Sequence, residues 1–173
     1  MAELARTPPV YRRRFRMVDL VPRPQNLAVV MGLDAWRGRC GSDLAPRAVD
    51  MVIDEPPIVK EHSFQAEPVA GKADYFLGSV GNWARAVHDP DRTSGRLSAI
   101  AFRRLAVRLR RLFELVTDCG EPVVVQFIED DESFESLAAP LLDEAGRSIL
   151  FCTMGIEQLP AVISPDHRLA DSA

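Results

Sequence analysis

Long apolar runs are missing from this sequence. The longest, Leu27 to Leu33, includes Gly32 and is soon followed by Asp34, whereas a membrane-spanning helix needs about 20 consecutive apolar residues. The arginines near the N-terminus are not followed by the apolar core of a signal peptide either. We therefore expect no membrane span, no secretory address and a cytoplasmic location.

Cysteine is scarce as well, and the motifs of several enzyme classes are missing. Cys40, Cys119 and Cys152 lie far apart with no CxxC pair, which fits neither a disulfide framework nor a structural zinc site. The sequence contains no GxSxG elbow, no Walker A motif and no GxGxxG fingerprint, so nucleophilic catalysis and nucleotide hydrolysis lack their usual signatures. We expect reduced, mostly buried thiols, no metal site and a protein that is not an enzyme; no cofactor is indicated.

The composition is that of one globular domain. The 173 residues are 47% hydrophobic and 27% charged, which suits a single core and is too short for two ordinary domains. We expect a mobile basic arm over residues 1–24, a folded domain over residues 25–158 and a tail over residues 159–173. The net charge of -4 disfavours general affinity for nucleic acid.

The clearest local pattern is an amphipathic stretch from Leu97 to Thr117. Its apolar residues follow the 3.6-residue period of a helix. This stripe consists of Ile100, Ala101, Leu105, Leu109, Leu112, Phe113 and Val116. The opposite face carries Arg103, Arg104, Arg108, Arg110 and Arg111. The pattern predicts one long helix that covers a sheet and presents arginines to solvent.

Strand patterns follow this helix. Val123 to Ile128 is rich in β-branched residues, and Phe134 to Leu142 and Arg147 to Thr153 flank a hairpin-sized turn, Asp143 to Gly146. Connections this short require antiparallel pairing, because parallel strands need longer crossovers. The sequence therefore predicts an α+β fold with an antiparallel sheet and flanking helices.

The N-terminal half is less regular. Asn26 to Arg37 has apolar residues at helical intervals and predicts a first helix. Lys72 to Val80 predicts a strand, and Gly78 and Gly81 permit a bulge or a close approach of another segment. Between them, Asp43 to Glu67 contains several prolines and no sustained period, so we expect an irregular connection with one short helix or strand.

Four short motifs occur in a fixed order between Leu27 and Ile156. They are Trp36-Arg37-Gly38-Arg39, Pro46-Arg47-Ala48-Val49-Asp50, Asp74-Tyr75-Phe76-Leu77 and Pro140-Leu141-Leu142-Asp143-Glu144-Ala145-Gly146. In this order they resemble the motifs of a bacterial PAS-like family. The resemblance implies a PAS-like sheet with helices and a sensory or regulatory role, and it supplies no catalytic residue. It also implies that the output passes through a partner protein or through self-association.

The same resemblance implies a ligand pocket between the sheet and the helices. We take Tyr75, Trp83, Gln126 and Phe127 as the candidate lining residues, with Gln126 as a polar contact for a small molecule. The alternative is that the aromatic side chains simply fill the core.

Two charged segments offer sharper but less favoured functions. His88 with Asp89 or Asp91 could form the acid/base pair of a small enzyme, since histidine titrates near neutral pH. The acidic run from Glu129 to Glu135 could bind a divalent cation. Because Asp, Glu and Pro are common in loops, we favour solvated loops for both segments.

Two surfaces are candidates for partners. The arginines of the N-terminal arm and of the long helix could bind nucleic acid through phosphates. We favour instead a protein partner or a symmetric homodimer, with Val30, Met31 and Trp36 on the first helix as apolar anchors. The alternative is that all three side chains pack inside the domain.

Overall fold

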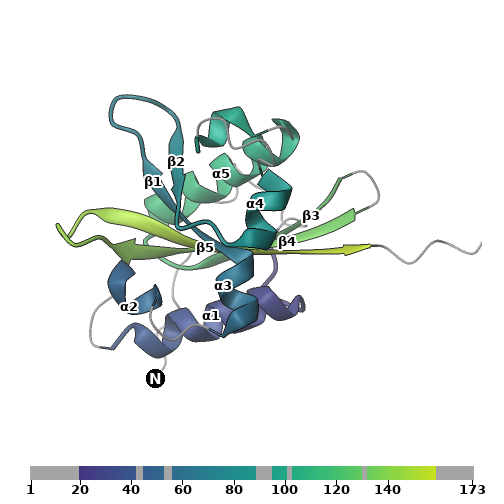
Figure 1. Cartoon of the computed structure of the whole chain (residues 1–173), viewed down its shortest axis with the longest axis horizontal. Coiled ribbons are helices and arrows are strands. Elements are labelled where there is room, and N and C mark those ends of the chain that lie inside the picture. The colour runs from purple at the N-terminus through teal and green to yellow at the C-terminus, as the bar shows by residue number, and fades with distance from the viewer. Residues whose placement is uncertain are drawn as a thin grey trace, which may run out of the picture.

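A five-stranded antiparallel sheet forms the middle layer of the structure (Figure 1). The computed structural model describes residues 20–41, 45–52, 56–88, 95–100, 103–129 and 132–158, and all structural statements concern these residues. The strands are β1 (Ser63–Pro68), β2 (Tyr75–Gly78), β3 (Val123–Glu129), β4 (Glu132–Leu142) and β5 (Ser148–Gln158). Their order across the sheet is β2-β1-β5-β4-β3. The predicted α+β class with an antiparallel sheet and flanking helices is confirmed.

The β4–β5 hairpin is the longest strand pairing of this sheet. The two strands pair from Glu132 opposite Gln158 to Leu142 opposite Ser148. In the connecting turn, the Asp143 carboxylate accepts a hydrogen bond from the Arg147 amide at 2.7 Å. Gly146 has a φ of 76°, a left-handed conformation that glycine adopts without strain. The predicted hairpin is therefore confirmed, although β5 extends beyond the expected end.

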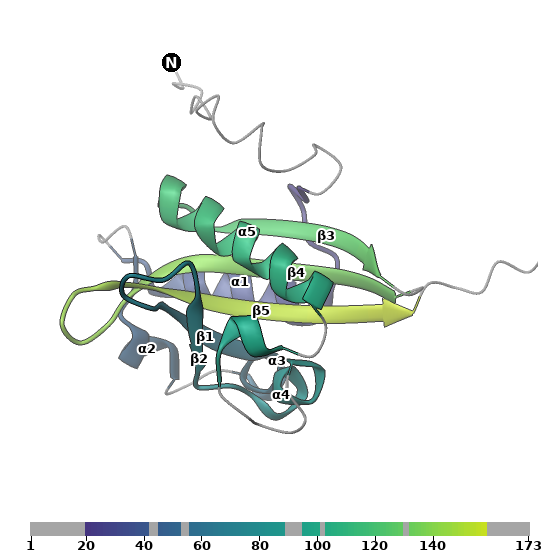
Figure 2. The same ribbon diagram turned by 90° about the horizontal axis from the view of Figure 1, so that it is seen from above.

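One face of the sheet is covered by α4 (Asn82–His88), the 3₁₀ helix η3 (Leu97–Ala99) and α5 (Arg103–Cys119). Figure 2 shows α5 lying along β3 and β4. The side chains packed between these helices and the sheet form the α5-side core. It includes Phe64, Tyr75, Leu77, Leu105, Leu109, Leu112, Phe113, Val125, Phe127 and Met154.

The predicted long helix is broken at its start, which corrects our expectation. Leu97–Ala99 is a 3₁₀ turn, Ile100 is extended with a ψ of 132°, and α5 begins at Arg103. Leu97 and Ile100 are both buried. Their spacing of three residues suits a 3₁₀ turn as well as an α-helix, so periodicity could not separate the two.

Asp74 holds the 3₁₀ turn against the start of β2. Its carboxylate accepts hydrogen bonds from the Tyr75 amide at 2.9 Å, the Ser98 amide at 3.1 Å and the Ser98 hydroxyl at 2.7 Å. Burial alone would raise the pKa of Asp74, but the bonds from Ser98 and Tyr75 and the charge of Arg110 hold that pKa below its usual value. Asp74 is therefore a structural carboxylate that fixes where the chain turns.

The other face of the sheet is covered by α1 (Leu27–Arg39), α2 (Ala48–Val52) and α3 (Pro57–His62). The side chains between them and the sheet form the α1-side core. It consists of Val29, Leu33, Trp36, Met51, Val59, Val124, Leu137, Ala139, Leu141, Ile149 and Phe151. The first helix is confirmed, with the Asn26 side chain capping it by accepting from the Ala28 amide at 3.0 Å.

The segment expected to be irregular, Asp43 to Glu67, contains more structure than we predicted. It forms α2, α3 and most of β1. Pro57 occupies the first turn of α3, where a missing backbone N–H costs little. Helices of five and six residues are too short to show a sequence period, which explains the error.

α1 packs very closely on β5. A Cβ added to Gly32 would lie 2.5 Å from the Thr153 side chain, so only glycine allows this approach. Thr153 is fully buried, and its hydroxyl has no hydrogen-bond partner within the described part of the chain. Further along, the Trp36 indole N–H donates to the Pro140 carbonyl of β4 at 2.8 Å. These contacts fix the position of α1 on the sheet.

The two segments predicted to flank the domain lie mostly outside the residues that the structure describes. Residues 1–19 of the predicted arm and residues 159–173 of the predicted tail lie outside the described residues. Within the described end of the predicted arm, Leu20 pairs with Val125 and the Val21 amide donates to the Val124 carbonyl at 3.0 Å. No disulfide joins the three cysteines, and burial raises the pKa of the Cys152 thiol. Among the described helices, none is long and apolar enough to cross a membrane.

Candidate functional site

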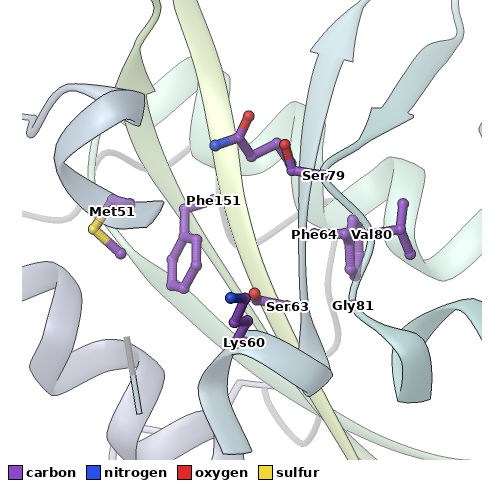
Figure 3. Close-up of a pocket in the computed structure, with 9 residues that line it drawn as sticks. Met51, Lys60, Ser63, Phe64, Ser79, Val80, Gly81 and Phe151 are labelled. Carbon is purple, nitrogen blue, oxygen red and sulfur yellow. The ribbon is translucent and has the colours of Figure 1, made fainter. Parts of the chain in front are cut away.

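A half-open pocket of about 260 Å³ lies on the α1 side of the sheet, where α2 and α3 meet β1 and β5 (Figure 3). Its lining residues are Met51, Lys60, Ser63, Phe64, Gln65, Ser79, Val80, Gly81 and Phe151. This volume lies just below the roughly 300–1,000 Å³ typical of pockets for drug-sized ligands. The pocket therefore suits a small molecule.

One wall of the pocket is the loop from Ser79 to Gly81, which joins β2 to α4. Ser79 has a φ of 49°, a left-handed conformation that is uncommon for residues other than glycine. The Gly81 amide donates to the Ser63 carbonyl at 2.8 Å. A Cβ on Gly81 would collide with the Lys60 and Glu61 carbonyls at the end of α3. The expected close approach near Gly78 and Gly81 is thus confirmed at Gly81, and it holds the wall rigidly.

The floor of the pocket combines apolar and polar groups. Met51 and Phe151 are almost fully buried and belong to the α1-side core. In β1, side chains alternate between the two faces of the sheet. Phe64 is buried with the α5-side core, so Ser63 and Gln65 are directed to the pocket side. An apolar ligand body and a polar group can both find partners here.

Lys60 brings the charge to this pocket. It is an exposed residue in the last turn of α3, and its amide donates to the Pro56 carbonyl at 3.0 Å. Lys60 and Ser63 both line the pocket, and Figure 3 shows the two residues at its α3 end. Among the nine lining residues, Lys60 alone is charged.

An open groove of about 610 Å³ continues from the pocket. It is lined by Ala48, Val49, Gln65, Glu67, Ser79, Asp143, Glu144, Ala145, Arg147 and Ile149. Gln65 and Ser79 line both spaces. A molecule in the pocket would therefore touch two residues that also form the floor of the groove.

Three of the four sequence motifs meet beside this groove. Trp36 donates to the Pro140 carbonyl, as described above, and the Arg39 guanidinium donates to the Asp50 carbonyl at 2.8 Å. The Leu142 amide donates to the Pro46 carbonyl at 3.0 Å. The motifs at residues 36–39, 46–50 and 140–146 thus come from distant parts of the sequence and build one corner of the fold.

The groove carries a small charge network at its hairpin end. The Arg147 guanidinium lies 2.6 Å from the Asp143 carboxylate and 3.2 Å from the Glu67 carboxylate. The hydrogen bond from the Arg147 amide, followed by that from its side chain, lowers the pKa of Asp143. These groups are exposed or close to solvent, so the network contributes little stability. With two carboxylates around one guanidinium, the network keeps an excess of negative charge at this end of the groove.

The structure does not bring all four predicted pocket residues together. Tyr75 and Phe127 are buried in the α5-side core, where Tyr75 meets Phe113 edge-on at 5.0 Å and Phe127 stacks on Phe134 at 5.1 Å. Neither the pocket nor the groove described above is lined by any of the four.

Trp83 and Gln126 lie apart from them. Trp83 packs at the margin of the α5-side core and stacks on His62 with ring centres 4.0 Å apart. Gln126 is exposed on the opposite face, because strand alternation places its neighbours Val125 and Phe127 in the core. Its amide donates to the Ser133 hydroxyl at 3.1 Å. The prediction of a pocket lined by these residues therefore has no support from the pocket and the groove described above.

Trp36 is also not an exposed anchor for a dimer. Only 6% of it is exposed, and its indole N–H is bound inside the chain. Val30 and Met31 are half-buried, and Met31 packs against the α1-side core. The alternative that all three side chains pack inside the domain is therefore confirmed for Trp36 and only in part for Val30 and Met31.

The other candidate sites have mixed outcomes. The His88 side chain, Asp89 and Asp91 lie outside the described residues, as do Asp130, Asp131 and the Glu129 side chain. Glu135, which we expected in a solvated acidic cluster, is 5% exposed and accepts from the Gln25 and Asn26 amides at 2.9 Å. It therefore holds the start of α1. Within the described ranges, no group of three His, Cys, Asp or Glu side chains could hold a metal ion.

The arginine face of α5 is partly engaged within the fold. The Arg108 guanidinium lies 5.8 Å from the centre of the Phe127 ring, close enough for a cation–π interaction. The charge of Arg110 acts on Asp74. The arginine face is therefore partly used within the domain itself.

Sequence reasoning missed the pocket because its residues come from short elements. Met51 and Lys60 lie in α2 and α3, inside the segment we had expected to be irregular. One signal was present: Gly81 follows the predicted strand at a place where close approach was expected.

No protein-family model matches the sequence, and comparisons with curated proteins and with solved structures give no match either.

Proposed function

We propose that this protein is a cytoplasmic sensory or protein-interaction module of PAS-like type, and not an enzyme. Its input is a small molecule bound in the pocket between α2, α3, β1 and β5. Its output is a change in the neighbouring groove, where a protein partner or a second copy of the chain binds. The observation that carries this proposal is that Gln65 and Ser79 line both spaces.

The topology supports the PAS-like part of the proposal. The five-stranded antiparallel sheet with flanking helices agrees with the PAS-like sheet and helices that the resemblance implies. The motifs that carry the resemblance gather at one corner of the groove. The family itself stays a resemblance based on these motifs.

A sensory role requires that the ligand binds two states of the protein with different affinity. The groove wall is suited to such a difference, because α2 has only five residues and its Ala48 and Val49 line the groove. Val49 on α2 is 48% exposed and lines the groove. A ligand that contacts Met51 two residues further along α2 can change the angle at which Val49 is presented.

The structure favours a protein partner over nucleic acid for the output. Arg108 and Arg110 have partners within the domain, and the groove lining contains Glu67, Asp143 and Glu144 beside a single arginine. Phosphates would be repelled there. Binding to DNA or RNA at two salt concentrations tests this directly, since salt-dependent binding would favour the nucleic-acid alternative.

The test of the proposed function is native mass spectrometry of the protein purified from cells. A bound small molecule appears as added mass, and the same spectrum reports dimers. The Ser63→Leu variant should fill the pocket and lose the added mass. Ser148→Leu, which changes an exposed serine on β5 of the same sheet, is the matched control and should retain it.

Two outcomes would contradict the proposal. Turnover of a substrate that survives Ser63→Leu would place an active site elsewhere. Wild-type protein that carries no small molecule, and that gains no thermal stability from any member of a metabolite panel, would remove the pocket as the input site.

A further inference from the structure

Lysine is rare in this chain, and one of its two lysines lies at the pocket. The sequence has 21 lysine and arginine residues together, of which only Lys60 and Lys72 are lysine. Lys72 is exposed in the turn between β1 and β2, at the end of this hairpin opposite to the Gln65–Gly78 pair beside the pocket. Lysine offers a compact ammonium with three donors, whereas arginine offers a wide planar fork. The compact ammonium of Lys60 suits a pocket of only about 260 Å³.

The charge of Lys60 is not neutralised inside the described part of the chain. Lys60 has no carboxylate within ion-pair distance there, and the ion pairs of Glu67 and Asp143 are both with Arg147. Glu61, its neighbour on α3, is exposed and does not line the pocket. The pocket thus has one positive charge and no negative charge in its lining.

The remaining lining sorts into a polar end and an apolar body. Ser63 lines the pocket together with Lys60, and its hydroxyl can donate a hydrogen bond to an anion (Figure 3). Met51 and the Phe151 ring offer apolar contact, and they are held in place by the α1-side core. Charge-assisted hydrogen bonds to an anion are roughly twice as strong as neutral ones.

From this arrangement we infer that the pocket binds a small monocarboxylate with an apolar body. The carboxylate accepts from the Lys60 ammonium and the Ser63 hydroxyl, and the apolar body lies against Met51 and Phe151. This inference rests on the proposed function of the pocket as the input site, and it adds the chemical class of the ligand.

The first experiment uses the rarity of lysine. Reductive methylation with ¹³C-formaldehyde keeps the lysine charge and labels only Lys60, Lys72 and the terminal amine. Two pairs of probes have matched shapes: benzoate with benzamide, and hexanoate with hexanamide. We expect at least one of the acids to shift the Lys60 signal in a saturable way and to leave Lys72 unchanged, while its amide has little effect. Acetate, which lacks an apolar body, should bind much more weakly.

The second experiment measures affinity on unmethylated protein by calorimetry. Lys60→Met should weaken binding of the acid roughly tenfold, the loss expected for a charged hydrogen bond. Lys72→Met removes the same charge elsewhere and should have no effect. Thermal melts of both variants confirm that each is folded.

The outcomes separate the two proposals. Equal binding of an acid and its amide, lost in Ser63→Leu, would keep the pocket as the input site and overturn the carboxylate inference. The same conclusion follows if neither acid binds but native mass spectra show another ligand that Ser63→Leu removes. Unchanged acid binding in Lys60→Met overturns the inference directly. If neither acid binds and no ligand is found, both proposals fail.

Discussion

Truncation of Leu109 tests whether α5 is attached to the sheet as described. Leu109 is 1% exposed and lies in the α5-side core, in the middle of the helix. Loss of about 0.8 kcal/mol per buried carbon group sets a lower bound near 2 kcal/mol for Leu109→Ala. The cavity left behind raises the cost toward about 5 kcal/mol if the surroundings do not collapse.

The assay is denaturant unfolding, supported by thermal melts. A loss of about 2–5 kcal/mol corresponds to a fall in Tm of roughly 4–20 °C, because a domain of this size shifts about 2–4 °C per kcal/mol. Val107→Ala is the matched control, since Val107 lies on the same helix but is 47% exposed. Its effect should stay within about 0.5 kcal/mol, helped by the higher helix propensity of alanine.

Equal, small losses for both variants would refute this reasoning. They would mean that the apolar stripe of α5 does not face the sheet. An unchanged slope of the unfolding free energy with denaturant is required for the comparison, because a changed slope indicates an altered denatured state.

Three further perturbations test other contacts. Trp36→Phe should cost roughly 1–3 kcal/mol, because it leaves a buried carbonyl of β4 without its donor; a dimer lost without loss of stability would contradict the internal role of this indole. Asp74→Asn should make the free energy of unfolding depend less on pH in the acid range. The pKa of Asp74 is lower in the folded state, so its carboxylate stabilises the fold above the unfolded pKa, which is near 4. This stability is lost as the pH falls through the folded pKa. Urea melts of the wild type and the variant from neutral pH to about pH 3 should therefore converge, and parallel profiles would count against the Ser98 bonds. Gly32→Ala should destabilise by roughly 1–3 kcal/mol through overpacking against Thr153, and Thr153→Ala in the same chain should recover part of that loss.

The strands and the long helix could be predicted because each leaves a long signal in the sequence. α5 has 17 residues with a continuous apolar stripe, and β3 to β5 are joined by turns too short for other pairings. The break before α5 could not be predicted, because it depends on Asp74, more than 20 residues earlier, binding the Ser98 amide and hydroxyl. Such a long-range bond has no local pattern.

The site was harder to predict than the fold. Gln126 was assigned to a pocket because polar residues in core strands often contact ligands, but the strand turns it to solvent. The aromatic ring of Phe127 packs against Phe134, and that of Tyr75 packs against Phe113. The pocket that the structure contains depends on how α2 and α3 sit on β1, and Lys60, Ser63 and Phe151 come together only in three dimensions.

The position of β5 in the sheet has a consequence for how the chain folds. β5 is the last described strand along the sequence, yet it lies in the centre, pairing Leu150 with Ala66 of β1 and Cys152 with Ala138 of β4. Until this strand is synthesised, the β1–β2 and β3–β4 hairpins cannot join, and their apolar edges stay open. Closing such distant pairings is slow and exposes aggregation-prone edges. A ribosome that stalls before residue 148 would therefore release two separate hairpins that depend on chaperones, and not a smaller version of the domain.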